Sequence, residues 1–196
     1  KVKPGVLIPR PETAELAIAV SEEMKDKQQA AILDICTGSG CIATTIALEC
    51  PKADVEAWDI SPEALQVAKE NAAKLGAKVN VVYQDALNFP YNGERWTAIV
   101  SNPPYVLDSE RKDMSPHVLN HEPSLALFVP DTDPLRFYTA IARYAITALV
   151  NGGLLYFEIN PLCAKMVEEM LTAAGFKDVA IVYDQYGKQR FVKAYR

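Results

Sequence analysis

Short apolar runs alternate along the chain with longer segments in which apolar side chains recur at helical spacing. Five of the runs are typical of buried strands and lie at 31–36, 54–60, 79–83, 97–101 and 154–159. Four of the longer segments predict helices, at 42–49, 61–76, 137–150 and 161–174. The second helix has the clearest limits, because Ser61 suits an N-cap, Pro62 a first helical position and Gly76 a C-terminal stop.

Two further strands, at 178–183 and 190–195, are close enough to pair as an antiparallel hairpin through a turn that contains Gly187. Repeated alternation of strand and helix favours a parallel sheet with helices on both faces. We therefore predict an α/β fold with a doubly wound, mostly parallel seven-stranded sheet and an antiparallel C-terminal hairpin. In this prediction residues 1–196 form one domain, with an N-terminal segment and helix over 1–28 and a Rossmann-like core over 29–196.

Between the fourth and fifth strands the regular pattern stops. Residues 102–132 are rich in proline and show no sustained periodicity. A connection of this length within a small domain usually has a function. We therefore expect this loop to contribute to a site.

Composition narrows the class of protein. With 49% hydrophobic and 23% charged residues, the chain is long enough to bury the core of one globular domain. It has no apolar run of roughly 18 residues, so no membrane span is predicted. A net charge of −5 and a pI near 5.1 argue against stable nucleic-acid binding, which requires a basic face. We expect a soluble, cytoplasmic protein; the sequence does not fix its oligomeric state, and a monomer is the expectation.

The cysteines and histidines do not predict a metal site. The four cysteines are Cys36, Cys41, Cys50 and Cys163, and no two of them have the CxxC spacing. Three of them lie in apolar stretches, so we predict buried, reduced thiols, as is usual in the cytoplasm. His117 and His121 have the spacing of two ligands on one helical face. Pro116 and Pro123 flank them, however, and no third ligand is near in the sequence, so no metal is predicted.

Polar residues gather where the predicted strands end, which is where open α/β sheets bind ligands. The first strand runs from Asp34 into the turn Cys36-Thr37-Gly38-Ser39-Gly40, whose glycines let the backbone approach a ligand. The second strand ends at Asp59, a carboxylate suited to a ribose diol. The third is followed by Asp85, which suits the exocyclic amine of a purine. Together these residues predict a site for a nucleoside-containing cofactor.

Two cofactors fit the first two strand ends. Gly38 to Ala43 satisfies the Gly-x-Gly-x-x-Ala pattern and, with Asp59, the fingerprint of nicotinamide dinucleotides. The carboxylates of Asp34 and Asp85 are unfavourable beside a pyrophosphate, but suit a ligand with cationic ammonium and sulfonium groups and no phosphate. S-adenosylmethionine, with S-adenosylhomocysteine as its product, is such a ligand and is the predicted cofactor.

The fourth strand is followed by Asn102-Pro103-Pro104-Tyr105, the most informative motif of the chain. A planar amide or base nitrogen is a poor nucleophile because its lone pair is delocalised. A site activates such a nitrogen by accepting its N–H groups and aiming it at the methyl donor. The Asn102 side chain and the Pro103 carbonyl offer two acceptors, both prolines stiffen the turn, and Tyr105 offers a flat face. These four residues are predicted to position the methyl acceptor.

These motifs resemble the HemK/PrmC family, the glutamine-specific methyltransferases that modify peptide chain release factors. The resemblance covers nearly all 196 residues and includes Ile8-Pro9-Arg10-Pro11-Glu12-Thr13, Glu122-Pro123 and the segment from Gly152 to Glu158. Asn-Pro-Pro-Tyr alone is similar to a motif of adenine-N6 and some ribosomal methyltransferases. Its combination with Pro-Arg-Pro-Glu-Thr ahead of the first strand resembles the release-factor family in particular.

The resemblance implies a class I S-adenosylmethionine-dependent methyltransferase that modifies the side-chain amide of the Gln in the Gly-Gly-Gln motif of release factors. It implies that the turn Cys36–Gly40 holds the methionine part of the cofactor and that Asp59 holds the ribose. It also implies that Ala86 lies along the adenine and that Asn102–Tyr105 grip the glutamine.

The N-terminal motif and the length add further expectations. The resemblance implies that Arg10 and Thr13 lie near the methionine end of the cofactor. Two positions depart from the family pattern: Cys36 replaces the usual first glycine of the loop, and Ala14 stands where Glu is common. Family members usually carry a small helical N-terminal domain that helps to hold the release factor, and it is missing from these 196 residues, which start at Lys1. If these residues are a fragment of a longer protein, we expect a catalytic domain that keeps its cofactor site and binds the protein substrate more weakly.

The residues by themselves leave three alternatives open. One is an rRNA or DNA base N-methyltransferase that uses the same Asn-Pro-Pro-Tyr clamp. The others are an inactive binding module and an NAD-binding oxidoreductase. The acidic pI favours a protein substrate over nucleic acid.

Overall fold

Seven strands form one sheet in the computed structural model, which describes residues 1–89 and 93–196. Their order across the sheet is β3-β2-β1-β4-β7-β9-β8. The strands are β1 (Ala31–Ile35), β2 (Asp54–Asp59), β3 (Val79–Tyr83), β4 (Trp96–Ser101), β7 (Leu149–Glu158), β8 (Lys177–Tyr183) and β9 (Gln189–Tyr195). The first five are parallel, and β9 is antiparallel to both β7 and β8. The predicted sheet, including its C-terminal hairpin, is confirmed.

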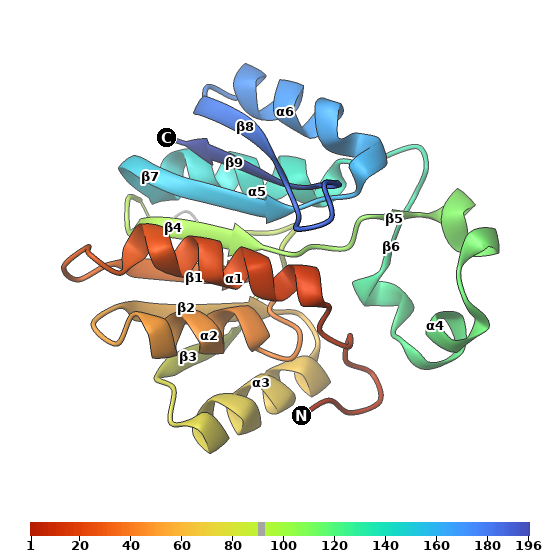
Figure 1. Ribbon diagram of the computed structural model, residues 1–196, viewed down its shortest axis with the longest axis horizontal. Helices are drawn as coiled ribbons and strands as arrows, with labels where there is room; N and C mark the ends of the chain where they lie inside the picture. Colours follow the sequence, from red (N-terminus) through yellow and green to blue (C-terminus); the bar gives the residue numbers. More distant parts are fainter. Residues whose placement is uncertain (90–92) are drawn as a thin grey trace.

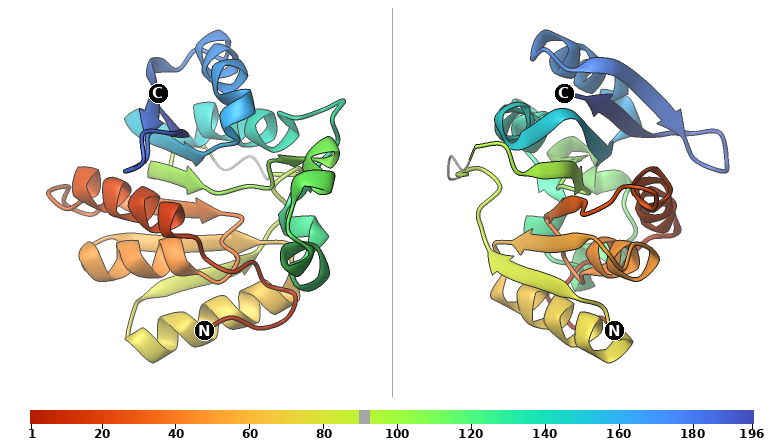
Figure 2. Two further views of the ribbon diagram at one scale, coloured as in Figure 1. Left: turned by 45° about the vertical axis from the view of Figure 1, so that its right-hand side comes forward. Right: turned by 90° about the vertical axis from the view of Figure 1, so that its left-hand side faces the viewer.

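Helices cover both faces of this sheet (Figures 1 and 2). The longer ones are α1 (Pro11–Met24), α2 (Cys41–Glu49), α3 (Pro62–Leu75), α5 (Arg136–Ala148) and α6 (Ala164–Ala173). Because side chains alternate along a strand, one face of the sheet packs against α1 and α2, while α5 and α6 pack against the other. Within the described residues, every helix is too short or too polar to span a bilayer.

The segment between α5 and β7 differs from its prediction. The helix ends at Ala148, and Leu149 already belongs to β7, where it pairs with Trp96. The helix predicted over 137–150 is therefore too long at its C-terminal end, and Gly152-Gly153, which would follow it as a stop, lie inside the strand. The sequence pattern does not predict this, because the two glycines pair with a residue far along the chain, Arg196. Gly152 N donates to the Arg196 carbonyl, and Arg196 N donates to the Gly153 carbonyl.

The loop at 102–132 contains short elements and lies beyond the carboxyl ends of the parallel strands (Figure 1). These are β5 (Val106–Leu107), the 3-10 helix η1 (Asp108–Asp113), α4 (Pro116–His121), η2 (Ser124–Ala126) and β6 (Phe128–Val129). The strands β5 and β6 pair in parallel and close the loop on itself. One further 3-10 helix, η3 (Pro161–Cys163), precedes α6 and forms the first turn of the helix predicted there.

The chain reverses its direction of travel across the sheet between β1 and β4. From β1 it continues outward to β2 and β3, whereas from β4 it continues the other way to β7. The ends of the two strands are tied together, because Ser101 Oγ donates to the Ile35 carbonyl over 2.6 Å. The loops after β1 and β4 diverge from this point, which is where doubly wound sheets form a ligand crevice.

Candidate active site

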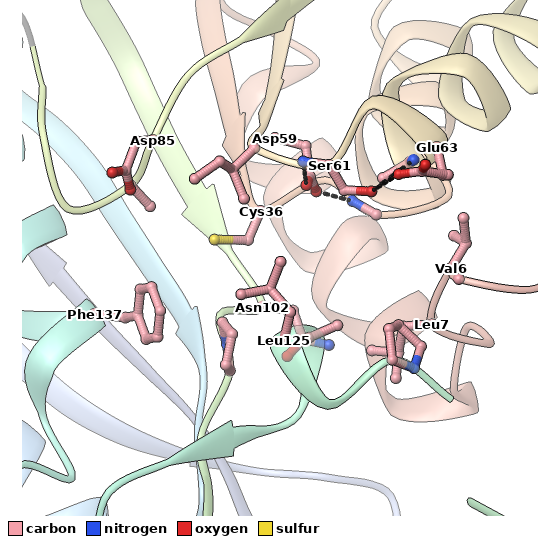
Figure 3. A pocket seen from close by; sticks show the side chains of 18 of the residues that line it. Val6, Leu7, Cys36, Asp59, Ser61, Glu63, Asp85, Asn102, Leu125 and Phe137 are labelled. Carbon is pink, nitrogen blue, oxygen red and sulfur yellow. Dashed lines mark hydrogen bonds between the residues drawn. The ribbon is translucent and has the colours of Figure 1, made fainter. Parts of the chain in front are cut away.

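A cavity of about 410 Å³ opens at this switch point. Its polar wall comes from the residues that follow successive strands. Figure 3 shows Cys36, Asp59, Asp85 and Asn102, from the ends of β1, β2, β3 and β4, arranged around one space. The four strand ends predicted to share a site thus meet at one cavity.

The opposite wall is largely apolar and comes from segments far apart in the sequence. Val6 and Leu7 precede α1, Leu125 lies in the 102–132 loop, and Phe137 is in the first turn of α5. In Figure 3, Phe137 lies on the side of Asp85, and Val6 and Leu7 lie on the other side of the space. The N-terminal segment and the long loop therefore complete a cavity that the sheet leaves open.

The turn after β1 depends on backbone conformations that glycine adopts most easily. Gly38 and Gly40 have φ angles of +56° and +77°. A Cβ at Gly40 would lie 2.9 Å from the Ala68 Cβ on α3, so this position also requires glycine for space. A Cβ at Gly38 would meet nothing within 4 Å, because Gly38 faces the cavity.

Cys36 also has a left-handed backbone, with φ at +60°. This explains in physical terms why a glycine suits the position, since a side chain there costs roughly 1–2 kcal/mol. Its thiol lines the cavity, and burial raises the pKa of the thiol well above its ordinary value. Cys36 therefore presents a neutral sulfur to whatever the cavity holds.

Asp34, Thr37, Ser39 and Gly40 form the inner side of the turn and do not line the cavity. Asp34 Oδ2 accepts hydrogen bonds from Thr37 Oγ1 at 2.5 Å and from the amide of Ala43 at 3.2 Å. Burial raises the pKa of Asp34 to about 7. The carboxyl thus braces the turn between β1 and α2, and its predicted direct contact with a ligand stays a prediction.

Asp59 lies at the point where β2 meets the turn. Its Oδ2 accepts from the amide of Gly38 at 2.8 Å, and its Oδ1 accepts from the amide of Ser61 at 2.9 Å. Burial raises the pKa of Asp59, and these bonds work against that rise. Each carboxylate oxygen accepts more than one hydrogen bond, so Asp59 retains capacity for two hydroxyls of a ligand.

The loop after β3 contributes a second carboxylate. Asp85 Oδ1 accepts from the amide of Leu87 at 2.8 Å, which fixes the tight turn there. Ala86 is buried and lines the cavity next to Asp85, and Leu87 lines it as well. The small side chain of Ala86 leaves this part of the cavity open to a flat group.

The turn after β4 separates two cavities. Asn102 lines both the large cavity and a small one of about 40 Å³; Pro104 lines the first, and Pro103 and Tyr105 line the second. Both prolines are buried. The Tyr105 hydroxyl donates to Glu158 Oε1 at 3.0 Å, and burial raises the pKa of Tyr105 far above its ordinary value. Tyr105 is therefore a neutral hydroxyl, fixed in place.

The N-terminal motif lies at the small cavity, and neither of its two candidate residues lines the large one. Arg10 lines the small cavity and pairs with Glu122 over 2.5 Å, which ties the N-terminal segment to the long loop. Thr13 is buried, and its Oγ1 lies 3.1 Å from Asn102 Nδ2. Their implied position near the methionine end of a cofactor stays a prediction.

The rings of the two histidines contact each other in α4, with centroids 4.6 Å apart and a tilt of 31°, and His121 Nδ1 lies 2.9 Å from the His117 carbonyl. In residues 1–89 and 93–196, no group of three or more His, Cys, Asp or Glu side chains is arranged to hold a metal ion.

Several cavity residues were not predicted. Leu125 lies in the 102–132 loop, which was expected to contribute to a site, although this residue was not named. Phe137 follows that loop in the first turn of α5 and was not predicted. Val6 and Leu7 carry no signal in the sequence, because only the tertiary path of the N-terminal segment brings them to the cavity. Ser61 and Glu63, at the start of α3, also line it.

The chain is similar to known methyltransferases. Residues 17–123 match the family described as Methyltransferase small domain. The chain is 47% identical over 197 residues to the release factor glutamine methyltransferase of Bacteroides thetaiotaomicron, covering 100% of this chain and 70% of the relative. It is 41% identical to the enzyme of the same name from Flavobacterium psychrophilum, covering 98% of this chain and 68% of the relative.

A solved structure supports the fold. A methyltransferase from Pyrococcus furiosus superimposes with a TM-score of 0.71 at 15% sequence identity, covering 100% of this chain and 87% of that one. At this level of identity the likeness concerns the arrangement of the sheet and helices.

Proposed function

The chain belongs to the family of release factor glutamine methyltransferases, and on this premise we propose how its site works. The protein transfers a methyl group from S-adenosylmethionine to the side-chain amide nitrogen of a glutamine in a release factor. We propose that this glutamine is the one in the Gly-Gly-Gln motif. The observation that carries the assignment of the site is the position of Asn102-Pro103-Pro104-Tyr105 between two adjoining cavities.

The large cavity fits S-adenosylmethionine in size and in chemistry. Its volume of about 410 Å³ lies in the range of small-molecule sites. Asp59 offers carboxylate oxygens to the ribose hydroxyls, Ala86 leaves room along the base, and Phe137 supplies a flat apolar surface. The open space at Gly38 lets the backbone approach the methionine part. When bound, the cofactor supplies an electrophilic methyl group on a sulfonium.

Two carboxylates favour that cofactor over a nicotinamide dinucleotide. Asp59 and Asp85 both line the cavity, and like charges oppose a pyrophosphate there. The family assignment also excludes the oxidoreductase alternative. The sequence pattern Gly38 to Ala43 is therefore a methyltransferase loop.

We propose that the small cavity receives the glutamine side chain. Asn102 Oδ1 accepts one N–H of the amide and the Pro103 carbonyl accepts the other, which fixes the plane of the amide and aims its nitrogen toward the large cavity. Neither proline has an N–H that would compete. Such positioning supplies several kcal/mol, on the order of 7–11 kcal/mol in well-aligned cases.

No general base is needed in this proposal. The new bond forms between the amide nitrogen and the methyl carbon as the carbon–sulfur bond breaks. The alkylated nitrogen then carries a positive charge and releases its proton to water. Tyr105 does not take that proton, because it keeps its own hydroxyl proton, which it donates to Glu158, and its pKa is raised far above the ordinary value.

The remaining expectations belong to this proposal. We propose that residues 1–196 act as one catalytic domain, in which 1–28 precede a Rossmann-like core at 29–196. A cytoplasmic location is supported by four cysteines that are all free thiols. The net charge of −5 favours a release factor over nucleic acid as partner. We propose that the protein acts as a monomer and without a metal ion.

A labelling experiment tests the substrate. The protein is incubated with tritiated-methyl S-adenosylmethionine together with a purified release factor and ribosomal RNA in one tube. We expect label in the release factor and background counts in the RNA, with label lost in Asn102→Ala. Label in the RNA and none in the factor would favour the nucleic-acid alternative instead.

A further inference from the structure

A buried carboxylate joins the N-terminal motif to the Asn-Pro-Pro-Tyr turn. Glu158, the last residue of β7, is 1% exposed and lines the small cavity. Its Oε2 accepts from Thr13 Oγ1 at 2.8 Å, and its Oε1 accepts from the Tyr105 hydroxyl at 3.0 Å. One side chain thus holds two residues that lie 145 and 53 positions away in the sequence.

The hydrogen bonds run in one direction. A threonine hydroxyl has a single proton, and Thr13 gives it to Glu158. Toward Asn102, Thr13 therefore offers only lone pairs, and the group of Asn102 that faces it at 3.1 Å is the donor Nδ2. The opposite orientation of the amide would place Asn102 Oδ1 against the oxygen of Thr13 with no proton between them.

This sets which end of the Asn102 amide is available to a substrate. With Nδ2 bound to Thr13, Oδ1 is the end left to accept a hydrogen bond. Only that orientation presents an acceptor to the N–H of a substrate amide, whereas the reversed one presents a donor. The charge of Glu158 fixes the direction of these hydrogen bonds, because a carboxylate accepts and does not donate.

We propose that Glu158 is a positioning residue for methyl transfer, which fixes Asn102 Oδ1 as the acceptor through Thr13 and holds the turn through Tyr105. The inference rests on the proposed function of the Asn102 turn. A second bond supports the hold on the turn, since Asn160 Nδ2 donates to the Tyr105 carbonyl at 3.1 Å. Neither Glu158 nor Thr13 lines the large cavity, so their effect falls on the acceptor and not on the cofactor.

Substitutions at Thr13 test this without removing a buried charge. Thr13→Val keeps the shape and removes the hydroxyl, which leaves Asn102 Nδ2 without its acceptor. Thr13→Ser keeps the hydroxyl. Ser21→Ala is the matched control, because the Ser21 hydroxyl is buried on the same helix and donates within that helix, to the Ala17 carbonyl.

The readouts are kcat for release-factor methylation and the Kd of S-adenosylmethionine by calorimetry. For Thr13→Val we expect kcat to fall by about tenfold to a hundredfold, as misaligned reactants do, with Kd within about twofold. Thr13→Ser should restore most of kcat, and Ser21→Ala should match the wild type. Glu158→Leu, which removes both acceptor oxygens, should lower kcat as Thr13→Val does.

The outcomes separate this inference from the proposed function. If the wild-type protein methylates the release factor and Thr13→Val does so with the same kcat, the role of Glu158 is overturned. An equal loss of kcat in Thr13→Val and Thr13→Ser would overturn it too, since shape and not the hydroxyl would then matter. If the wild-type protein binds the cofactor and leaves the release factor unmodified, the proposed substrate is wrong instead.

Discussion

The amide nitrogen of Gly38 donates a hydrogen bond of 2.8 Å to Oδ2 of Asp59, which joins the turn after β1 to the end of β2. The other carboxylate oxygen of Asp59 accepts from Ser61 at the start of α3. One side chain therefore fixes two loops that surround the large cavity, while it still faces the space between them. A substitution at either Gly38 or Asp59 should therefore lower the affinity for the cofactor.

Asp59→Asn should weaken the binding of S-adenosylmethionine. The variant replaces one carboxylate oxygen with an NH2 group, so it loses an acceptor for the ribose. The NH2 group would also face the backbone N–H of Ser61 or Gly38, which is itself a donor. A loss of about 1.4 kcal/mol corresponds to a Kd about tenfold higher by calorimetry.

Asp54→Asn serves as the matched control for Asp59→Asn. It lies at the other end of β2 with a side chain that is 73% exposed, and it should leave Kd unchanged. Equal Kd values for both variants would contradict the role given to Asp59.

Gly38→Ala should lower both the cofactor affinity and the stability of the protein. The added Cβ meets no protein atom within 4 Å and therefore enters the cavity, while the left-handed backbone at +56° costs roughly 1–2 kcal/mol. We expect Kd to rise about tenfold, as for a contact worth about 1.4 kcal/mol. Thermal unfolding and calorimetry on one preparation measure both effects.

Gly187→Ala is the control for backbone strain. Gly187 has φ of +77°, open space around an added Cβ, and a place in the turn between β8 and β9. It should show a similar loss of stability and an unchanged Kd. A similar rise of Kd in both variants would show that strain alone, and not the cavity, accounts for the effect at Gly38.

Asp34→Asn should change how stability depends on pH. The pKa of Asp34 is raised by burial from 3.8 to about 7, so the folded state keeps a proton that the unfolded state releases. The stability contributed by the neutral form is complete below about pH 4 and is lost as the pH rises through about 7. Asn does not titrate, so the variant should gain about 2–3 kcal/mol relative to wild type between about pH 5 and pH 8.

Urea unfolding of Asp34→Asn and wild type at both pH values measures this difference. Asn also retains an oxygen that accepts from Thr37 and Ala43, so the turn keeps its bonds in the variant. Parallel stability curves for the two proteins would mean that Asp34 is ionised throughout this range.

The sequence predicts the sheet well because the pattern that specifies it is local. Most of the seven strands contain a short run of apolar residues whose limits are visible in the sequence itself. Ser61 caps α3 by accepting from the amide of Ala64, as predicted. The start of β7 was wrong because Leu149 and Gly152 depend on pairing with Trp96 and Arg196, which are distant in the sequence. Local pattern holds no information about such partners.

The residues of the site also fall into those that local pattern predicts and those that depend on distant partners. Asp59, Asp85 and Asn102 were predicted because each lies at or just after the end of a strand, and parallel strands bring their ends together. The bond between Thr13 and Asn102 spans 89 positions and depends on how α1 packs across the sheet. Glu158 did leave a signal, since a carboxylate at the end of the apolar run 154–159 is unusual unless it has buried partners.

The central claim is that the Asn102 turn aims a release-factor glutamine at a methyl donor. The most direct test is tandem mass spectrometry of the Gly-Gly-Gln peptide, after a release factor is incubated with S-adenosylmethionine and either wild-type protein or Asn102→Ala. The account predicts one added methyl group on the side chain of that glutamine with the wild type, and an unmodified peptide with Asn102→Ala. An unmodified glutamine with the wild type, or full modification with Asn102→Ala, would contradict it.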